Sequence, residues 1–159
     1  MTPELAALLP TRDGVGPSVI ALPPGEWSQV IDYLVYRFPT IPREEIASRM
    51  QRGDVRDESG QFVLPDAVNR AHRKLYYYRR IDDEPRIPFD ERILFEDELI
   101  VVADKPHFLP VTPGGRYLQE TLLVRLKRKL GLDTLAPMHR IDRETAGLVL
   151  FTKQPQTRG

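Results

Sequence analysis

The apolar residues of this 159-residue chain fall into two separately patterned segments, divided by a stretch rich in proline and acidic residues, IDDEPRIPFDE, at 81–91. Proline fixes φ and removes a backbone donor, so such a stretch continues neither a helix nor the interior of a sheet. We therefore predict a boundary near residue 82. The parts would be an N-terminal arm (1–26), a small first module (27–81) and a second unit (82–159).

The first module is predicted to contain two helices followed by short strands. Apolar residues in 27–38 recur at helical spacing until Pro39, and a second, shorter helix is expected in 42–53. The stretch 54–64 favours two short strands around a Ser-Gly turn, and KLYYYRR at 74–80 alternates as a strand does. This order indicates an αα-β module.

The second unit is predicted to combine a hairpin, a helix and a further strand. Two apolar runs, 93–95 and 99–103, flank the turn EDE, and a loop broken by proline and glycine follows. Leucines recur at helical spacing in 118–130, and GLVLFTK at 147–153 is typical of a buried strand. Together with the first module, this order predicts an α+β protein.

Composition excludes several classes of protein. The chain has no cysteine, no apolar run of membrane-spanning length and no signal-peptide pattern at its start, so we expect a cytoplasmic protein that is not bound to a membrane. Its three histidines lack metal-ligand spacing, and no glycine-rich loop runs into Lys-Ser/Thr. We therefore expect neither a metal nor a small-molecule cofactor.

Charge is unevenly distributed although the formal net charge is zero. Basic residues outnumber acidic ones by nine to six in 43–80 and by seven to three in 116–143, whereas acidic residues dominate 82–98 by eight to two. Two basic segments could face a polyanion, or could be the solvated faces of ordinary helices. Both interpretations stay open at this point.

Particular residues carry the polyanion interpretation. The second helix bears Arg43, Arg49 and Arg52 away from its apolar positions, and we treat these as candidate RNA-binding residues. The run 76–78 places tyrosines among basic residues, which suits stacking on bases, yet alternate strand residues also face a core.

The most informative stretch is MHRIDRETAG at 138–147, where charged residues gather between an apolar helix and an apolar strand. In one interpretation, Asp142 or Thr145 caps backbone donors at a turn. In another, Arg140 and Arg143 favour the ionised form of the carboxylate between them and hold a polyanionic substrate. The residues alone thus support a phosphate-rich ligand and a reactive aspartate.

Two motifs in order resemble those of a known family. HRIDRETAGLVLFTK (139–153) resembles the signature of the RluA-type pseudouridine synthases, and LIVVADKPHFLPVTPGG (99–115) resembles their upstream motif. PREEIASRMQRGDVRDESGQFV (42–63) is more weakly similar to the S4-like RNA-binding module that often precedes their catalytic domain. The resemblance implies an S4-like module, followed by the N-terminal part of a mixed-sheet synthase domain.

By position, the resemblance implies that Asp142 is the catalytic aspartate for converting uridine to pseudouridine in ribosomal or transfer RNA. Arg140 would enter the RNA stack when the target nucleotide is flipped out, a role that suits a planar cation. The isomerisation needs no cofactor. The residues implied to shape or support the catalytic loop are His139, Thr145, Gly147, Lys105 and Pro106.

Two expectations concern activity. In the family, a tyrosine and a basic residue that complete the site follow the aspartate-bearing strand, so we expect the 159-residue chain, as a fragment, to have little activity. The alternative function is that of a non-catalytic RNA-binding protein, using 43–52 and the basic surface of 118–129. A purely structural or protein-interaction module is a third class, and it predicts no salt-dependent RNA binding.

Overall fold

The computed structural model describes residues 7–157, which form two compact units. Of the described residues, the first unit comprises 7–10 and 16–79, and the second comprises 11–15 and 80–157. Within these residues no helix is long and apolar enough to cross a bilayer.

The region expected to be an N-terminal arm contains a strand. Its residues Ser18–Ala21 form strand β1, which pairs with the strand at 74–77. Residues 11–15 make a tight turn, and Val15 packs in a small cluster with Leu118 and Val124 of the second unit. The arm lacks a sequence period because its contacts are made with distant segments.

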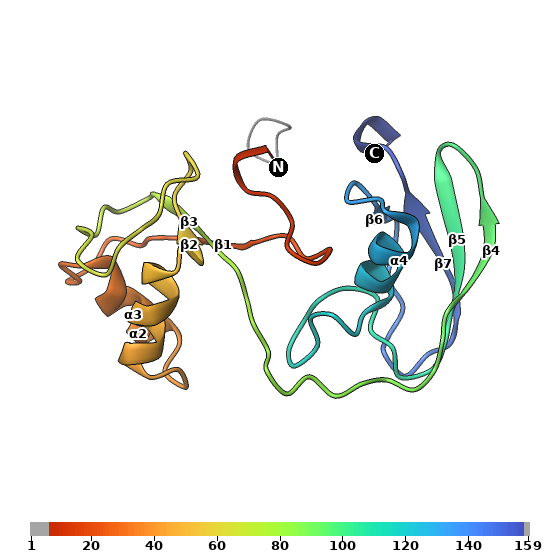
Figure 1. The fold of residues 1–159 in the computed structure, drawn as a ribbon, viewed down its shortest axis with the longest axis horizontal. Coiled ribbons are helices and arrows are strands. Elements are labelled where there is room, and N and C mark those ends of the chain that lie inside the picture. The colour runs from red at the N-terminus through yellow and green to blue at the C-terminus, as the bar shows by residue number, and fades with distance from the viewer. Residues whose placement is uncertain (1–6, 158–159) are drawn as a thin grey trace. The chain divides into compact units, whose positions relative to one another are not determined.

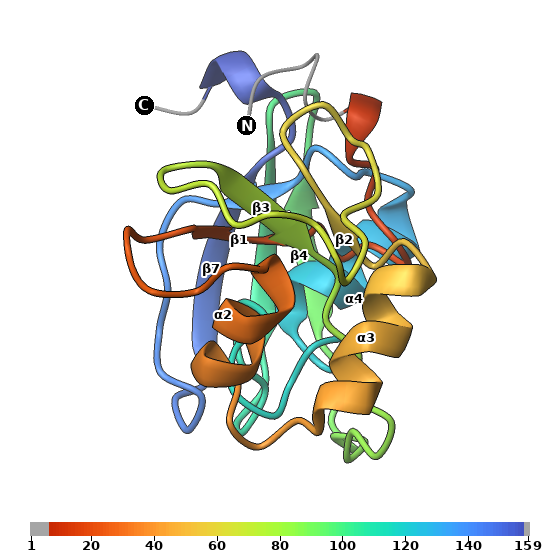
Figure 2. The ribbon, with the colours of Figure 1, turned by 90° about the vertical axis from the view of Figure 1, so that its left-hand side faces the viewer.

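The first unit contains the predicted helices and a small antiparallel sheet (Figure 1). The helices α2 (Val30–Arg37) and α3 (Arg43–Gln51) lie on the same side of the sheet (Figure 2). In the sheet, β3 (Lys74–Tyr77) lies between β1 and β2 (Val55–Arg56). The αα-β order expected from the sequence is therefore present, with β1 as an additional strand.

The tyrosine run belongs to the core of this unit rather than to an exposed stacking surface. Tyr76 and Tyr78 are buried, each with 7% of its surface exposed. Tyr77 packs edge-to-face against Phe38 with ring centroids 5.4 Å apart. These contacts favour the core interpretation over base stacking.

The second unit contains one four-stranded sheet in the order β4-β5-β7-β6. All strand pairs formed within residues 7–157 are antiparallel, whereas the resemblance implied a mixed sheet. The fold of the described chain is therefore α+β with antiparallel sheets. The second unit's elements are β4 (Arg92–Glu96), β5 (Ile100–Lys105), α4 (Leu122–Leu130), β6 (Ala136–Pro137), β7 (Gly147–Thr152) and a short 3-10 helix (Pro155–Thr157).

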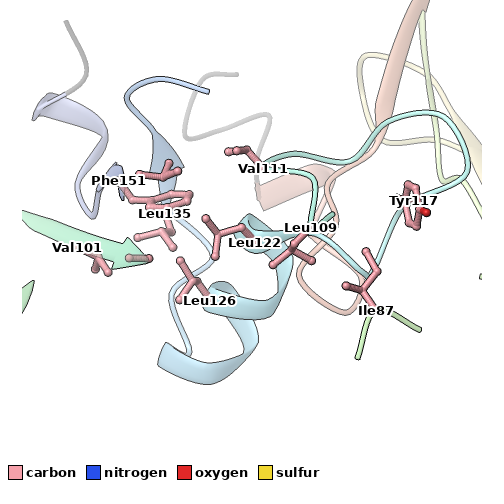
Figure 3. Packing of buried hydrophobic residues seen from close by; sticks show 11 residues of the cluster. Ile87, Val101, Leu109, Val111, Tyr117, Leu122, Leu126, Leu135 and Phe151 are labelled. Carbon is pink, nitrogen blue, oxygen red and sulfur yellow. The ribbon is translucent and has the colours of Figure 1, made fainter. Parts of the chain in front are cut away.

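The core of the second unit forms where α4 packs on this sheet. Leu122 and Leu126 of α4 join Val101 of β5 and Phe151 of β7 in one cluster (Figure 3). In β5, alternation buries residues 101, 103 and 105 on the helix-covered face, so the last of them, a lysine, is carried into the interior. The sheet thereby places the charged group of Lys105 in the interior at the end of β5.

The helix expected from residue 118 begins at Leu122 instead, because an acidic side chain of the connector binds the preceding backbone. The Glu84 carboxylate accepts N–H bonds from Leu118, Gln119 and Glu120 at 2.6, 2.9 and 2.7 Å. The connector thereby holds the entry to α4.

Arg125 also departs from its expected place on a basic surface. Its side chain is only 11% exposed and donates to the backbone oxygens of Ile87 and Phe89, both at 2.7 Å. Glu91 and Glu120 accept from the same guanidinium. Arg125 therefore joins the connector to α4 and is removed from any surface that could bind RNA.

Candidate active site

The loop that joins β6 to β7 contains the motif HRIDRETA and lines an open cavity of about 600 Å³. The other lining residues come from the loop after β5, which carries the second motif. Antiparallel pairing of β5 with β7 places Lys105 directly opposite Gly147, so both loops leave the sheet at the same edge. The cavity is lined by Pro110, Val111, Thr112, Arg140, Ile141, Asp142 and Arg143.

Asp142 presents an exposed carboxylate to this cavity. Its backbone oxygen accepts the N–H of Thr145 at 3.1 Å, which closes a turn, but its side chain has no hydrogen-bond or ion-pair partner within residues 7–157. The side chain therefore does not cap the turn. A carboxylate left free in a cavity is available to act as a base or nucleophile.

The two arginines beside Asp142 do not bind it, contrary to the electrostatic argument made from the sequence. Arg140 is exposed on the cavity wall and lacks an acidic partner in the described part of the chain. Arg143 donates through Nε and Nη2 to Oε1 of Glu144 at 2.9 and 2.7 Å. Its Nη1 donates to the Tyr117 hydroxyl at 3.1 Å, and its guanidinium lies 5.7 Å from the centre of that ring.

These contacts shift the pKa values of two side chains. The hydrogen bond from Arg143 lowers the pKa of Glu144, and the same bond raises the pKa of Arg143. Both groups therefore stay charged around neutral pH, and the pair persists there.

Lys105 anchors the loop from inside the protein. Its ammonium donates to the backbone oxygens of Pro106, Leu109 and Arg143 at 3.0, 2.7 and 3.1 Å, and the residue is fully buried. Burial lowers the pKa of Lys105, an effect that the nearby Glu144 carboxylate opposes. The bond to Arg143 ties the residue after Asp142 to the end of β5.

Two histidines fasten the same loop at further points. His107 lies with Nδ1 at 2.7 Å from the backbone oxygen of Glu144, and since only an N–H can donate to a carbonyl, Nδ1 carries the proton. His139 accepts the N–H of Leu150 through Nε2 at 3.2 Å. Asp142 is therefore carried on a loop attached on both of its sides.

Gly147 begins β7 with φ of 149°, a backbone conformation that residues with a Cβ rarely adopt. A Cβ at this position would meet Ile141 at 3.7 Å, which is ordinary contact. Glycine is therefore required here by the backbone and not by lack of space.

Sequence reasoning named Asp142, Arg140, His139, Thr145, Gly147, Lys105 and Pro106, and the structure brings these residues together around the cavity and the loop that lines it. It missed His107, Thr112 and Tyr117. His107 directly follows the Lys-Pro pair, and this adjacency was the one available indication of its role. The position of Tyr117 depends on a tertiary contact that spacing does not reveal.

The candidate RNA-binding arginines of α3 are occupied within the first unit. Arg43 pairs with Asp32 at 2.9 Å, and Arg49 pairs with Glu45 at 2.7 Å. Arg52 lies 3.6 Å from the same Glu45 carboxylate and 3.5 Å from Asp54. Their charges are thus partly balanced by acidic neighbours. For metals, residues 7–157 contain no group of three or more His, Asp or Glu side chains suited to holding an ion.

The geometry defines an α+β unit with a candidate site for acid–base or nucleophilic chemistry. Residues 99–158 match the family model for RNA pseudouridylate synthase. Residues 99–158 therefore belong to the pseudouridine synthase family, which confirms the resemblance of the two motifs within them.

Curated relatives agree with this family. An uncharacterized RNA pseudouridine synthase of Synechocystis sp. is 32% identical over 122 residues, which cover 77% of this chain and 42% of the relative. The tRNA pseudouridine(31) synthase of Saccharomyces cerevisiae is 45% identical over 157 residues, with 85% and 38% covered. The mitochondrial tRNA pseudouridine(32) synthase of the same yeast is 28% identical over 128 residues, with 80% and 27% covered. The chain thus spans less than half the length of these relatives.

Proposed function

We propose that this chain carries the catalytic aspartate of an enzyme that isomerises uridine to pseudouridine in RNA. The observation that carries the proposal is the Asp142 carboxylate, which has no partner among residues 7–157 and lines an open cavity together with Arg140, on a loop attached at both ends. The substrate would be a uridine in ribosomal or transfer RNA, since the yeast relatives are named for transfer RNA. No cofactor takes part.

The chemistry needs one carboxylate that is firmly positioned. The N1–C1′ bond of uridine breaks, the uracil turns, and a C5–C1′ bond forms while C5 loses its proton and N1 gains one. In our proposal Asp142 either attacks the sugar or removes a proton to give a glycal, and both routes need the ionised carboxylate. Anchoring of the loop fixes the carboxylate against the reacting atoms.

Arg140 is proposed to fill the space left by the flipped nucleotide. The reacting atoms of a stacked base are inaccessible, so the nucleotide has to leave the helix. A planar guanidinium without an acidic partner can stack and donate hydrogen bonds in its place. The exposed position of Arg140 on the same cavity wall as Asp142 supports this role.

The remaining site residues are proposed to hold the loop. Lys105 and Pro106 would do so through the ammonium–carbonyl bonds, His139 through its bond to β7, and Thr145 with Gly147 through the turn and the start of the strand.

The first unit is proposed to be an S4-like RNA-binding module over 27–81. Its two helices followed by short strands support this assignment. Arg43, Arg49 and Arg52 would contact phosphate by exchanging their acidic partners for it. A cytoplasmic location is part of the proposal, although one yeast relative is named as mitochondrial.

The test compares Asp142→Asn with the parent, using both the 159-residue chain and any longer polypeptide that contains it. The RNA carries tritium at C5 of its uridines, and the tritium released to water measures the reaction. We expect the substitution to lower the rate at least about 100-fold because it removes the reacting carboxylate. RNA affinity should stay unchanged, since the carboxylate binds no phosphate.

Asp133→Asn serves as the matched control, because Asp133 is an exposed aspartate of the same unit that lies outside the cavity lining. Equal rates in the parent and Asp142→Asn would refute the role of Asp142. RNA binding without tritium release from either form of the parent would overturn the enzyme proposal and leave RNA binding as the function.

A further inference from the structure

Two phenylalanines of the second unit, Phe89 and Phe108, are exposed at the surface, and the mechanism above uses neither. Phe89 belongs to the connector and Phe108 to the loop after β5, and their exposed fractions are 46% and 48%. Their ring centroids lie 6.2 Å apart, and the ring of the exposed His107 lies 6.0 Å from that of Phe108. Phe89, His107 and Phe108 thus form one aromatic surface, which we call the aromatic platform.

The backbone conformation of Phe108 is unusual for its side chain. Its φ is 66°, in the left-handed region, where a bulky residue with a Cβ is an outlier. In the described part of the chain, the other non-glycine residues with positive φ are Asp13 and His72, whose types enter this region more readily. Glycine would suit the backbone at 108 without strain. An exposed ring kept at a strained position of a loop is typical of a functional residue.

Both phenylalanines are held in place through the backbone. Arg125 donates to the carbonyl of Phe89 at 2.7 Å. Leu109 directly follows Phe108 and is fully buried in the core cluster (Figure 3), and its carbonyl accepts from Lys105 at 2.7 Å. Fixed segments therefore present the rings, and little conformational freedom is left to lose when a planar ligand binds.

The aromatic platform is continuous with the candidate active site. The loop that bears Phe108 lines the cavity from Pro110 onwards. Nδ1 of His107 donates to the carbonyl of Glu144 at 2.7 Å, two residues after Asp142. A uridine in the cavity would therefore place its neighbours in the RNA strand close to this surface.

The chemistry of the aromatic platform suits a nucleobase better than an aliphatic segment of protein. Every base has a flat π-face that stacks on aromatic side chains, whichever base it is. The exposed leucines of 80–157 belong instead to β4, to β7 and to the turn before β5. The platform thus consists of rings, while the exposed aliphatic surface lies on the sheet.

We propose that the aromatic platform stacks an unpaired base of the RNA strand that neighbours the flipped uridine, with Phe108 as its main contact. The inference rests on the proposed function, because that function makes RNA the ligand and the cavity the place of the uridine. A base on Phe108 offsets the strain of its backbone in the complex. The platform thereby favours uridines whose neighbouring nucleotide is not held in a base pair.

The first experiment measures binding of the 159-residue chain to a single-stranded oligouridylate that carries one 2-aminopurine, a base whose fluorescence is quenched by stacking. We expect the parent to quench this fluorescence. Phe108→Leu should weaken binding at least about fivefold and abolish most of the quenching, because leucine is apolar but has no π-face. Phe108→Trp should keep both binding and quenching. The salt dependence of the affinity should be equal in these proteins, since no phosphate contact changes.

Phe95→Leu is the matched control, because Phe95 lies on β4, outside the aromatic platform, and is 50% exposed. It should bind and quench as the parent does. No quenching by the parent would overturn the inference. Equal RNA affinity of the parent and Phe108→Leu would also overturn it, and would favour a protein segment as the occupant of this surface.

Asp142→Asn separates this inference from the proposed function. It should bind and quench as the parent does, because stacking on Phe108 does not need the carboxylate. Binding and quenching without tritium release in any form of the parent would refute the enzyme and leave the aromatic platform as an RNA contact. Tritium release at the same KM in the parent and Phe108→Leu would refute the platform alone.

A last variant, Phe108→Asn, tests why the strained position keeps its ring. Asparagine tolerates a positive φ, so the temperature of unfolding should not fall, while RNA binding should weaken as it does in Phe108→Leu. A lower temperature of unfolding in Phe108→Asn would show that the ring is kept for packing, and would refute a role in RNA binding as the reason for the strain.

Discussion

Replacing Lys105 with methionine tests whether the loop that carries Asp142 is held from inside the protein. Methionine has about the length of lysine and is apolar, so it fills the same buried space without donating. The backbone oxygens of Pro106, Leu109 and Arg143 would lose their donor together. We expect the second unit to be destabilised and the loop to open more often.

The size of the effect follows from opposing contributions. Three hydrogen bonds from a charged donor contribute about 5–9 kcal/mol in all, at roughly 1.5–3 kcal/mol each. Removing a buried ammonium recovers several kcal/mol of desolvation cost. The net loss should be about 2–4 kcal/mol of unfolding free energy.

The effect of pH on the free energy of unfolding through Lys105 has a definite sign. Burial lowers the pKa of Lys105 below its ordinary 10.5, so between these two values the unfolded chain binds the proton more often than the folded chain. The free energy of unfolding therefore rises with pH through that window and is flat with respect to this group below it. The rise should be absent in Lys105→Met.

Native-state hydrogen exchange of Leu126 and Val149 amides is the suitable assay, because a chain of two units need not unfold in one transition. Amide hydrogen exchange in residues 140–146 should increase by more than the loss of global stability accounts for. Lys129→Met, an exposed lysine of the same unit, is the control and should change stability by about 0.5 kcal/mol or less. A Lys105→Met protein as stable as the parent, with unchanged exchange in the loop, would refute the anchoring argument.

Other predictions concern positions where the backbone conformation or backbone hydrogen bonds determine stability. Gly147→Ala should cost about 1–3 kcal/mol because of its φ of 149°, while Gly114→Ala, where a Cβ would meet nothing closer than 3.9 Å, should cost little; thermal unfolding of both variants checks this. Glu84→Gln should lower stability by about 1–3 kcal/mol and loosen 118–120, since three backbone donors lose a charged acceptor. Amide exchange measures this, with Glu98→Gln as the exposed control, and equal protection in the two variants would contradict it.

Local patterns in the sequence predicted the helices and hairpin well, because each is determined by periodicity within one segment. The presence of the helices α2, α3 and α4 and the pairing of β4 with β5 agree with the spacing of apolar residues. Strand β1 was missed because it is short and its partner, β3, is far along the chain. The start of α4 was misplaced because Glu84 binds the preceding backbone from 34 residues away.

At the candidate site, the sequence identified residues but not their partners. Asp142 and Arg140 lie in one cavity as expected of residues two apart on a loop. Arg143 was expected to face Asp142, yet it binds Glu144 and the hydroxyl of Tyr117, which is 26 residues away. Which of two adjacent acids an arginine binds is decided by tertiary contacts, so no spacing rule could have predicted it.

Because β5 pairs with β7, packing of the hydrophobic core determines how accurately the site residues are positioned. Lys105 faces Gly147 in the same register that faces Val101 with Phe151. A shift of β7 by one residue would turn Phe151 and Val149 out of the core and separate Lys105 from its carbonyl on the loop. Burial of these apolar side chains therefore sets where Asp142 is held, and substitutions in the core can alter the chemistry without touching the cavity.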